Sequence, residues 1–153
     1  AATGAEIGAN DFRISDMGGT GDPAYSAYTP AVAYDTTHNE YLVVWQGDDS
    51  VAGVVEGEGE IFGQLLDAGT GLEIGVNDVR ISEMGGTGDP NYDAFTPELT
   101  YGNTGCLVAW LGDDNTGGLV DDEFEIFGKM LGILPFSDGF ESGDTSAWST
   151  TLP

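Results

Sequence analysis

Carboxylate side chains gather in two glycine-rich stretches of this chain, where their type and spacing suit oxygen ligands for a cation. Closely spaced carboxylates repel each other unless a cation or a proton lies between them. Glycines such as Gly57 and Gly59 let the backbone turn its carbonyl groups inward, and Ca²⁺ takes carboxylate and carbonyl oxygens together. We therefore expect Ca²⁺ sites here, although the spacing is not that of an EF-hand, and a solvated acidic loop is the alternative. The acids correspond one to one: Asp48, Asp49, Glu56, Glu58 and Glu60 in the first stretch, and Asp113, Asp114, Asp121, Glu123 and Glu125 in the second.

A second acidic motif surrounds a run of glycines and reads DMGGTGDP at residues 16–23 and EMGGTGDP at residues 83–90. A phosphate-binding loop is excluded, because no lysine follows the glycines and no helix is expected after them. Two interpretations stay open, a second Ca²⁺ site and a structural turn. The candidate ligands are Asp16, Asp22, Glu83 and Asp89.

Residues for nucleophilic or zinc-dependent catalysis are scarce. His38 is the single histidine and lies in a polar link, and Cys106 is the single cysteine, in a strand-like run where we expect a small buried side chain. A Ser-His-Asp triad and a zinc site therefore lack partners. A carboxylate pair for glycoside hydrolysis is an alternative. We expect no catalytic residue.

The charge of the chain is strongly one-sided. Its 153 residues include 27 acidic and 3 basic side chains, which gives a net charge of −24. This balance argues against nucleic acid and anionic membrane surfaces as partners, since both need clustered Lys and Arg. No stretch reaches the ~18–20 apolar residues of a membrane span. Two of the bases, Arg13 and Arg80, occupy equivalent positions, and we expect each to pair with nearby carboxylates.

The chain consists of two tandem copies of one sequence repeat. Residues 4–30 match residues 71–97 at 20 of 27 positions, and residues 41–66 match residues 106–131 at 14 of 26. Tandem repeats bury their cores between neighbouring units. We divide the chain into a first repeat (1–67), a second repeat (68–132) and a tail (133–153). Residues 1–8 match residues 68–75, so we expect the chain to start inside a repeat, cut from a processed precursor or from a longer parent.

Each repeat offers four short segments that are rich in β-branched and aromatic residues and bounded by Gly, Asp, Asn and Pro. No window shows a helical period. The strand expected at 41–46 is apolar on both faces, which predicts a central strand covered on both sides. The fold class is thus all-β, with two four-stranded antiparallel repeats that form propeller-like blades or a sandwich. The expected strands are 11–15, 31–34, 41–46 and 60–66, with their matches 78–82, 98–101, 106–111 and 125–131.

The strings NEYLVVWQGDD and EIFGQLLDAGTG resemble tandem, propeller-like repeats of large exported bacterial proteins. The tail contains DGFESGD followed by a tryptophan and resembles segments near the C-termini of exported bacterial proteins. The resemblance implies an extracellular or cell-surface location, and for the tail an export or anchoring role. Apolar residues in the tail also suggest a donor strand that docks on an open sheet edge.

These observations favour a non-enzymatic extracellular structural protein, stabilised by Ca²⁺, that assembles with copies of itself into a fibre or surface layer. The alternative is a Ca²⁺-dependent adhesion module that binds a glycan or a protein. Its aromatic side chains near the glycine turns would stack on sugar rings: Tyr25, Tyr28, Tyr92 and Phe95.

Overall fold

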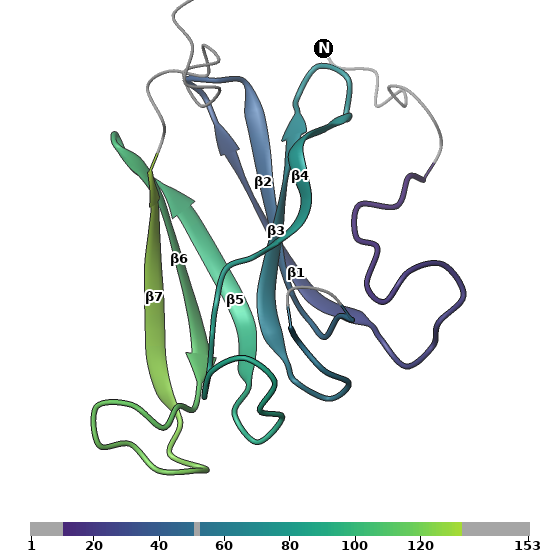
Figure 1. Cartoon of the computed structure of the whole chain (residues 1–153). Coiled ribbons are helices and arrows are strands. Elements are labelled where there is room, and N and C mark those ends of the chain that lie inside the picture. The colour runs from purple at the N-terminus through teal and green to yellow at the C-terminus, as the bar shows by residue number, and fades with distance from the viewer. Residues whose placement is uncertain (1–10, 51–52, 133–153) are drawn as a thin grey trace, which may run out of the picture.

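A computed structural model of the chain describes residues 11–50 and 53–132, which form seven strands in two antiparallel sheets (Figure 1). No helix occurs in these ranges, so none could cross a membrane, and the all-β expectation is confirmed. The tail, residues 133–153, lies outside the described part of the chain. The four-stranded sheet runs in the order β1 (Ala27–Asp35), β2 (Glu40–Gly47), β3 (Glu60–Asp67) and β4 (Glu73–Arg80), and the three-stranded sheet in the order β5 (Ala94–Tyr101), β6 (Gly105–Gly112) and β7 (Glu125–Gly132).

Short polar turns join neighbouring strands and set their register. Asp35 pairs with Glu40 across the first hairpin, and its carboxylate accepts a hydrogen bond from the Thr37 N–H at 2.7 Å. Asp67 ends β3, and its carboxylate accepts hydrogen bonds from the N–H and hydroxyl groups of Thr70 at 2.8 and 2.7 Å. Aspartate favours such turns because its side chain can bond to backbone groups a few residues further on.

The fourth strand of the first sheet comes from the second repeat. β4 hydrogen-bonds to β3, with Phe62 opposite Arg80 and Leu66 opposite Glu73. The start of one repeat therefore completes the sheet of the repeat before it. The expectation of four strands in each repeat needs correction on this point. The second sheet has three strands within the described residues, and residues 11–15 form no strand there, although their match overlaps the end of β4.

The central strand β2 is covered on both faces, as its sequence predicts. One face, with Leu42 and Val44, packs against the three-stranded sheet, where β5 lies against β1, β2 and β3. We call this contact the inner junction. Its other half comes from the second repeat and includes Val108 and Trp110. Buried residues from both sheets and from the link after β4 complete it: Ile61, Ile81, Met84, Ala94 and Cys106.

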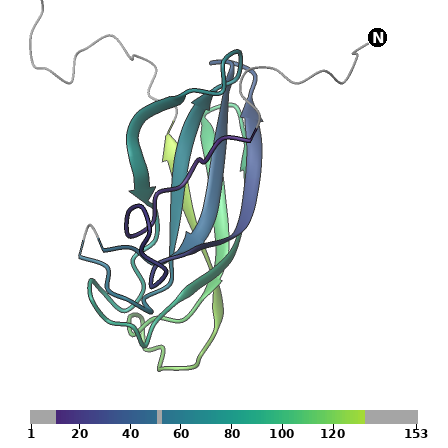
Figure 2. The ribbon, with the colours of Figure 1, turned by 90° about the vertical axis from the view of Figure 1, so that its right-hand side faces the viewer.

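The opposite face of β2 carries Val43 and Trp45 and forms a second, smaller core. No sheet lies on it within the described residues. Instead the segment 11–25 crosses this face and packs Met17 against it, with half-buried Ile14 and Tyr25 (Figure 2). The equivalent residues of the second repeat, Ile81, Met84 and Tyr92, belong to the inner junction.

We expect Gly63→Ala and Gly128→Ala to differ although the two glycines are equivalent. A Cβ at Gly63 would lie 2.8 Å from Ile81 Cδ1, inside the inner junction, whereas a Cβ at Gly128 would meet its nearest atoms at 3.4 and 3.6 Å. Gly63→Ala should lower the free energy of unfolding by about 1–3 kcal/mol through overpacking. Gly128→Ala should change it by less than about 1 kcal/mol. Urea unfolding of both variants measures the difference, and equal losses would contradict the packing described.

Candidate functional site

The acidic loops gather at one end of the two sheets. Residues 48–50 and 53–59 lie between β2 and β3, residues 81–93 link β4 to β5, and residues 113–124 link β6 to β7. These described residues lie toward the lower end in Figure 1. The antiparallel order of the strands brings them together, because every second connection returns to the same end. Ten of the fourteen expected Ca²⁺ ligands thus lie on these neighbouring loops.

Two of these acids are fully buried and bind one arginine. Glu58 and Glu60 have 0% exposed side chains, and Arg80 Nη2 contacts an Oε1 atom of each, at 3.3 Å for Glu58. Ser82 Oγ donates a hydrogen bond to Glu60. We call these four residues the Arg80 cluster. It joins the start of β3 and the loop before it to the end of β4 and the link after it, and so joins the two repeats.

Backbone groups supply the remaining partners of the Arg80 cluster. The N–H of Met84 donates to Glu60 Oε1 at 2.9 Å, and those of Val55 and Gly88 each donate to Glu58 Oε2 at 3.0 Å. Burial raises the pKa of Glu60, although the hydrogen bonds from Ser82 and Arg80 act in the opposite direction. Two carboxylates around one cation leave the cluster net negative, and several donors are needed to hold it.

An Asp-Asp pair follows each of the strands β2 and β6, and the second aspartate of each pair binds the nearby glycine turn. Asp49 accepts hydrogen bonds from the N–H groups of Gly18 and Ser50 at 2.9 and 2.6 Å. Its match Asp114 accepts them from the N–H groups of Gly85 and Asn115 at 3.1 and 2.7 Å. Burial raises the pKa of Asp114, but hydrogen bonds from Thr116 and these backbone groups outweigh burial, and the pKa falls below its usual value.

The other aspartate of each pair closes its own loop. Asp48 accepts hydrogen bonds from the N–H groups of Ser26 and Gly57, both at 3.0 Å. Asp113 accepts them from the N–H groups of Asp93 and Asp122, at 2.9 and 3.3 Å. The same two bonds recur in both repeats, so these carboxylates serve as structural acceptors that hold the loops in place.

Asp93 lies near carboxylates of both repeats at this end of the molecule. Its Oδ1 atom accepts a hydrogen bond from the Gly59 N–H at 2.6 Å. Burial raises its pKa most, and the nearby carboxylates of Asp113, Glu58 and Asp48 raise it further, against the effect of the Gly59 bond. Asp93 and Asp48 line a cavity of about 230 Å³. Sequence reasoning missed Asp93, although one signal was present, since the first repeat has Ser26 in its place.

The acids of the glycine motif lie in local turns. Asp16 pairs with Arg13 at 3.0 Å, and Asp22 accepts a hydrogen bond from the Ala24 N–H at 3.1 Å. Glu83 accepts one from the Thr87 hydroxyl at 3.0 Å, and Asp89 one from the Asn91 N–H at 3.2 Å. Of the remaining expected ligands, Glu56 and Asp121 are exposed. Among the described residues no group of three or more His, Cys, Asp or Glu has the arrangement of a metal site, and Ca²⁺ stays a prediction.

The glycines of the motif lie in tight turns against a tyrosine ring in each repeat. Gly18 and Gly85 have φ angles of +62° and +60°, and a Cβ on either would overlap the ring of Tyr25 or Tyr92, respectively. Both tyrosines are half-buried against the cores of their repeats. Phe95 is also half-buried, with its ring centroid 6.0 Å from that of Phe124. Of the four expected sugar-stacking side chains, only Tyr28 is exposed.

The single histidine and the single cysteine take structural positions. His38 Nδ1 lies 2.7 Å from Asp35 Oδ2 in the β1–β2 hairpin. Cys106 is buried in the inner junction, as expected, and burial raises the pKa of its thiol. A thiol with a raised pKa is a poor nucleophile at neutral pH.

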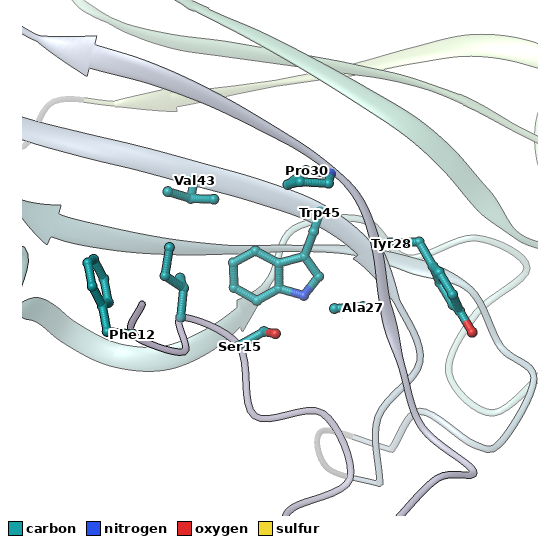
Figure 3. A pocket seen from close by; sticks show the side chains of 8 residues that line it. Phe12, Ser15, Ala27, Tyr28, Pro30, Val43 and Trp45 are labelled. Carbon is teal, nitrogen blue, oxygen red and sulfur yellow. The ribbon is translucent and has the colours of Figure 1, made fainter. Parts of the chain in front are cut away.

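An apolar groove follows the outer face of the four-stranded sheet. Around Trp45 it holds about 260 Å³, with Phe12 to one side of the indole and Tyr28 to the other (Figure 3). It continues over Val43 into a space of about 340 Å³ that Val32, Tyr41 and Leu66 also line. Sequence reasoning did not single out this groove, because its walls come from the segment 11–25 and from β1–β3 together.

Comparison of the chain with protein-family models, with curated proteins and with solved structures finds no match. What the residues do must therefore be inferred from their own geometry.

We expect Arg80→Ala and Arg13→Ala to have very different effects on stability. The Arg80 side chain is 11% exposed and faces two buried carboxylates, whereas the Arg13 side chain is 60% exposed and pairs with Asp16. Arg80→Ala leaves buried charges without a cation and should lower the free energy of unfolding by about 3–5 kcal/mol. Arg13→Ala should lower it by at most about 1 kcal/mol. Thermal and urea unfolding at low protein concentration measures both, and similar losses would contradict the role of the Arg80 cluster.

Proposed function

We propose that this chain is a non-enzymatic structural protein that assembles with copies of itself. One observation carries the proposal, namely the outer face of the three-stranded sheet. Ile126, Met130 and Leu107 point away from the inner junction and are 74%, 61% and 41% exposed. Their equivalents Ile61, Leu65 and Leu42 are buried or half-buried in the junction or packed against it.

An uncovered apolar sheet face is typical of a surface that binds another protein. The edge of the same sheet is also open in the described residues, because β7 pairs only with β6, whereas its equivalent β3 pairs with both β2 and β4. Strands with free N–H and C=O groups pair readily with another chain. The resemblance of the repeat strings to exported bacterial arrays supports an extracellular or cell-surface location, and a fibre or surface layer as the product.

Ca²⁺ belongs to this proposal as a stabilising ion. The net charge of −24 opposes both folding and the approach of a second copy. At the loop end Asp93 faces three carboxylates, those of Asp113, Glu58 and Asp48, which raise its pKa. A divalent cation near the cavity lined by Asp48 and Asp93 would offset this repulsion.

Assembly should depend on the outer face of the three-stranded sheet. We expect Ile126→Thr to weaken self-association by about tenfold, since it removes buried apolar area at a contact between copies. Val76→Thr is the matched control, because Val76 is 76% exposed in β4, away from that face. Sedimentation velocity over a concentration series, with electron microscopy of the products, measures the effect. A wild-type chain that stays monomeric at every concentration would contradict the proposal.

Millimolar Ca²⁺ should raise the melting temperature relative to EDTA. Extracellular Ca²⁺ modules bind at ~10⁻⁴–10⁻³ M, and ligand at ten times that constant stabilises each site by about 1.4 kcal/mol. NaCl at equal ionic strength is the control, because it screens the acidic charge without occupying a site. If NaCl matches the effect of Ca²⁺, or if neither salt has an effect, the acidic loops are not calcium sites.

A further inference from the structure

The inner junction shows how two repeats of this chain bind each other. From the first repeat it uses the face of β2 and β3 that carries Leu42, Val44 and Ile61. From the second it uses the opposite face of its own sheet, with Val108 and Trp110, together with Ile81 and Met84 from the link after β4. The junction therefore joins two different surfaces, one from each repeat.

Each of these two surfaces occurs a second time, on the outside of the molecule. The outer face of the three-stranded sheet carries Leu107, Ala109 and Ile126, which are equivalent to Leu42, Val44 and Ile61. The outer face of the four-stranded sheet carries Val43 and Trp45, which are equivalent to Val108 and Trp110. The two outer faces are thus the two halves of a second junction.

The apolar groove fits this second junction. Five of the seven residues that line its part of about 340 Å³ are Ile14, Val32, Tyr41, Val43 and Leu66. The five equivalent side chains of the second repeat all belong to the inner junction or pack against it, beside Leu42, Val44 and Leu65 of the first repeat: Ile81, Leu99, Cys106, Val108 and Leu131. The groove is therefore the half of a junction from which the opposite sheet is missing in a single copy.

The charged side chains of the Arg80 cluster also have equivalents on the outside of the molecule. In the Arg80 cluster, Glu58 and Glu60 come from the first repeat and Arg80 and Ser82 from the second, across the pairing of β3 with β4. The equivalent carboxylates, Glu123 and Glu125, are exposed at the start of β7, the open edge strand of the three-stranded sheet in the described residues. On the other outer face, Arg13 takes the place of Arg80 and Ser15 that of Ser82. The Arg13 side chain is 60% exposed, against 11% for Arg80.

We propose that the outer face of the three-stranded sheet of one copy docks on the outer face of the four-stranded sheet of a second copy, with the second copy's Arg13 between Glu123 and Glu125 of the first. This inference rests on the proposed self-assembly and names its interface. The contact is heterologous, because it joins different surfaces. It either closes into a ring or continues as a filament.

Charge complementarity favours this contact over a symmetric one. A two-fold dimer through the outer face of the three-stranded sheet would leave Glu123 and Glu125 without Arg13, the exposed arginine, which lies over the other sheet. Unpaired like charges at an interface are strongly unfavourable. The head-to-tail contact instead brings one of the three basic side chains of the chain to two exposed acids.

A charge exchange tests the pairing directly. Arg13→Glu and Glu125→Arg each place like charges at the contact, so each variant alone should self-associate at least about tenfold more weakly than the wild type in sedimentation velocity. An equimolar mixture should regain wild-type association, because every contact between unlike copies then pairs opposite charges. Both side chains are exposed in the single copy, so the melting temperature of each dilute variant should stay within a few degrees of the wild type.

Gly128→Ala provides a test that is independent of charge. In the inner junction a Cβ at the equivalent Gly63 would lie 2.8 Å from Ile81 Cδ1. In the proposed contact the partner copy's Ile14 takes the place of Ile81. Gly128→Ala should therefore fold like the wild type but associate at least about tenfold more weakly.

The outcomes separate this interface from the proposal on which it rests. The head-to-tail pairing is supported if the wild type assembles, each charge variant by itself associates weakly, and the mixture of the two variants regains association. If the wild type assembles but the charge variants and Gly128→Ala assemble equally well, the interface is wrong and self-assembly stands. A wild-type chain that remains monomeric at high concentration, with and without Ca²⁺, would overturn both.

Discussion

A strand that is apolar on both faces must be covered on both faces, and the rest of this structure follows from that constraint. β2 carries Leu42 and Val44 on one face and Val43 and Trp45 on the other, and all four side chains are buried. A single antiparallel sheet buries one face at most, so a second layer is required on each side. The three-stranded sheet supplies one layer, and the segment 11–25 supplies the other. Because β6 is equivalent to β2, the three-stranded sheet also needs cover on both of its faces.

The acidic loops at the end of the sheets supply hydrogen-bond acceptors for their own backbone. A loop rich in glycine loses much conformational freedom on folding, and its backbone N–H groups need acceptors. Asp49 and Asp114 provide acceptors for the turns at Gly18 and Gly85, and Asp48 and Asp113 do so for the loops that follow them. The carboxylates thus compensate for a backbone that has little other support. Where the loops of the two repeats meet, burial and neighbouring carboxylates raise the pKa of Asp93.

The fold class could be read from the sequence because it depends on local patterns. Alternating apolar residues and short polar links predict the hairpins of β1–β2 and β5–β6, and the apolar run at 41–46 predicts a central strand. The phase of the repeat could not be read, because a period says nothing about which strand joins which sheet in space. The pairing of β4 with β3 depends on the turn at Asp67 and on contacts between the repeats.

The candidate site, too, could be predicted from the sequence only in part. Its acids are visible as a cluster in the sequence, but their partners come from residues far along the chain. Arg80 reaches Glu58 across 22 positions because β4 returns beside β3, whereas its equivalent Arg13 pairs locally with Asp16. Nothing in the sequence alone distinguishes the two arginines. Asp93 in place of Ser26 is the one visible departure from the repeat that marks the crowded centre.

The offset between sequence repeat and sheet also constrains how such a gene can change in length. Because β4 belongs by sequence to the second repeat and in space to the first sheet, the boundary between the two repeats at residue 67 is not the end of the first sheet. Recombination that adds or removes a whole repeat preserves every strand pairing wherever the crossover falls. A change by any fraction of a repeat leaves a sheet without its last strand. We therefore expect a change in the number of repeats to disturb the strand pairing less than a change in the length of the repeat.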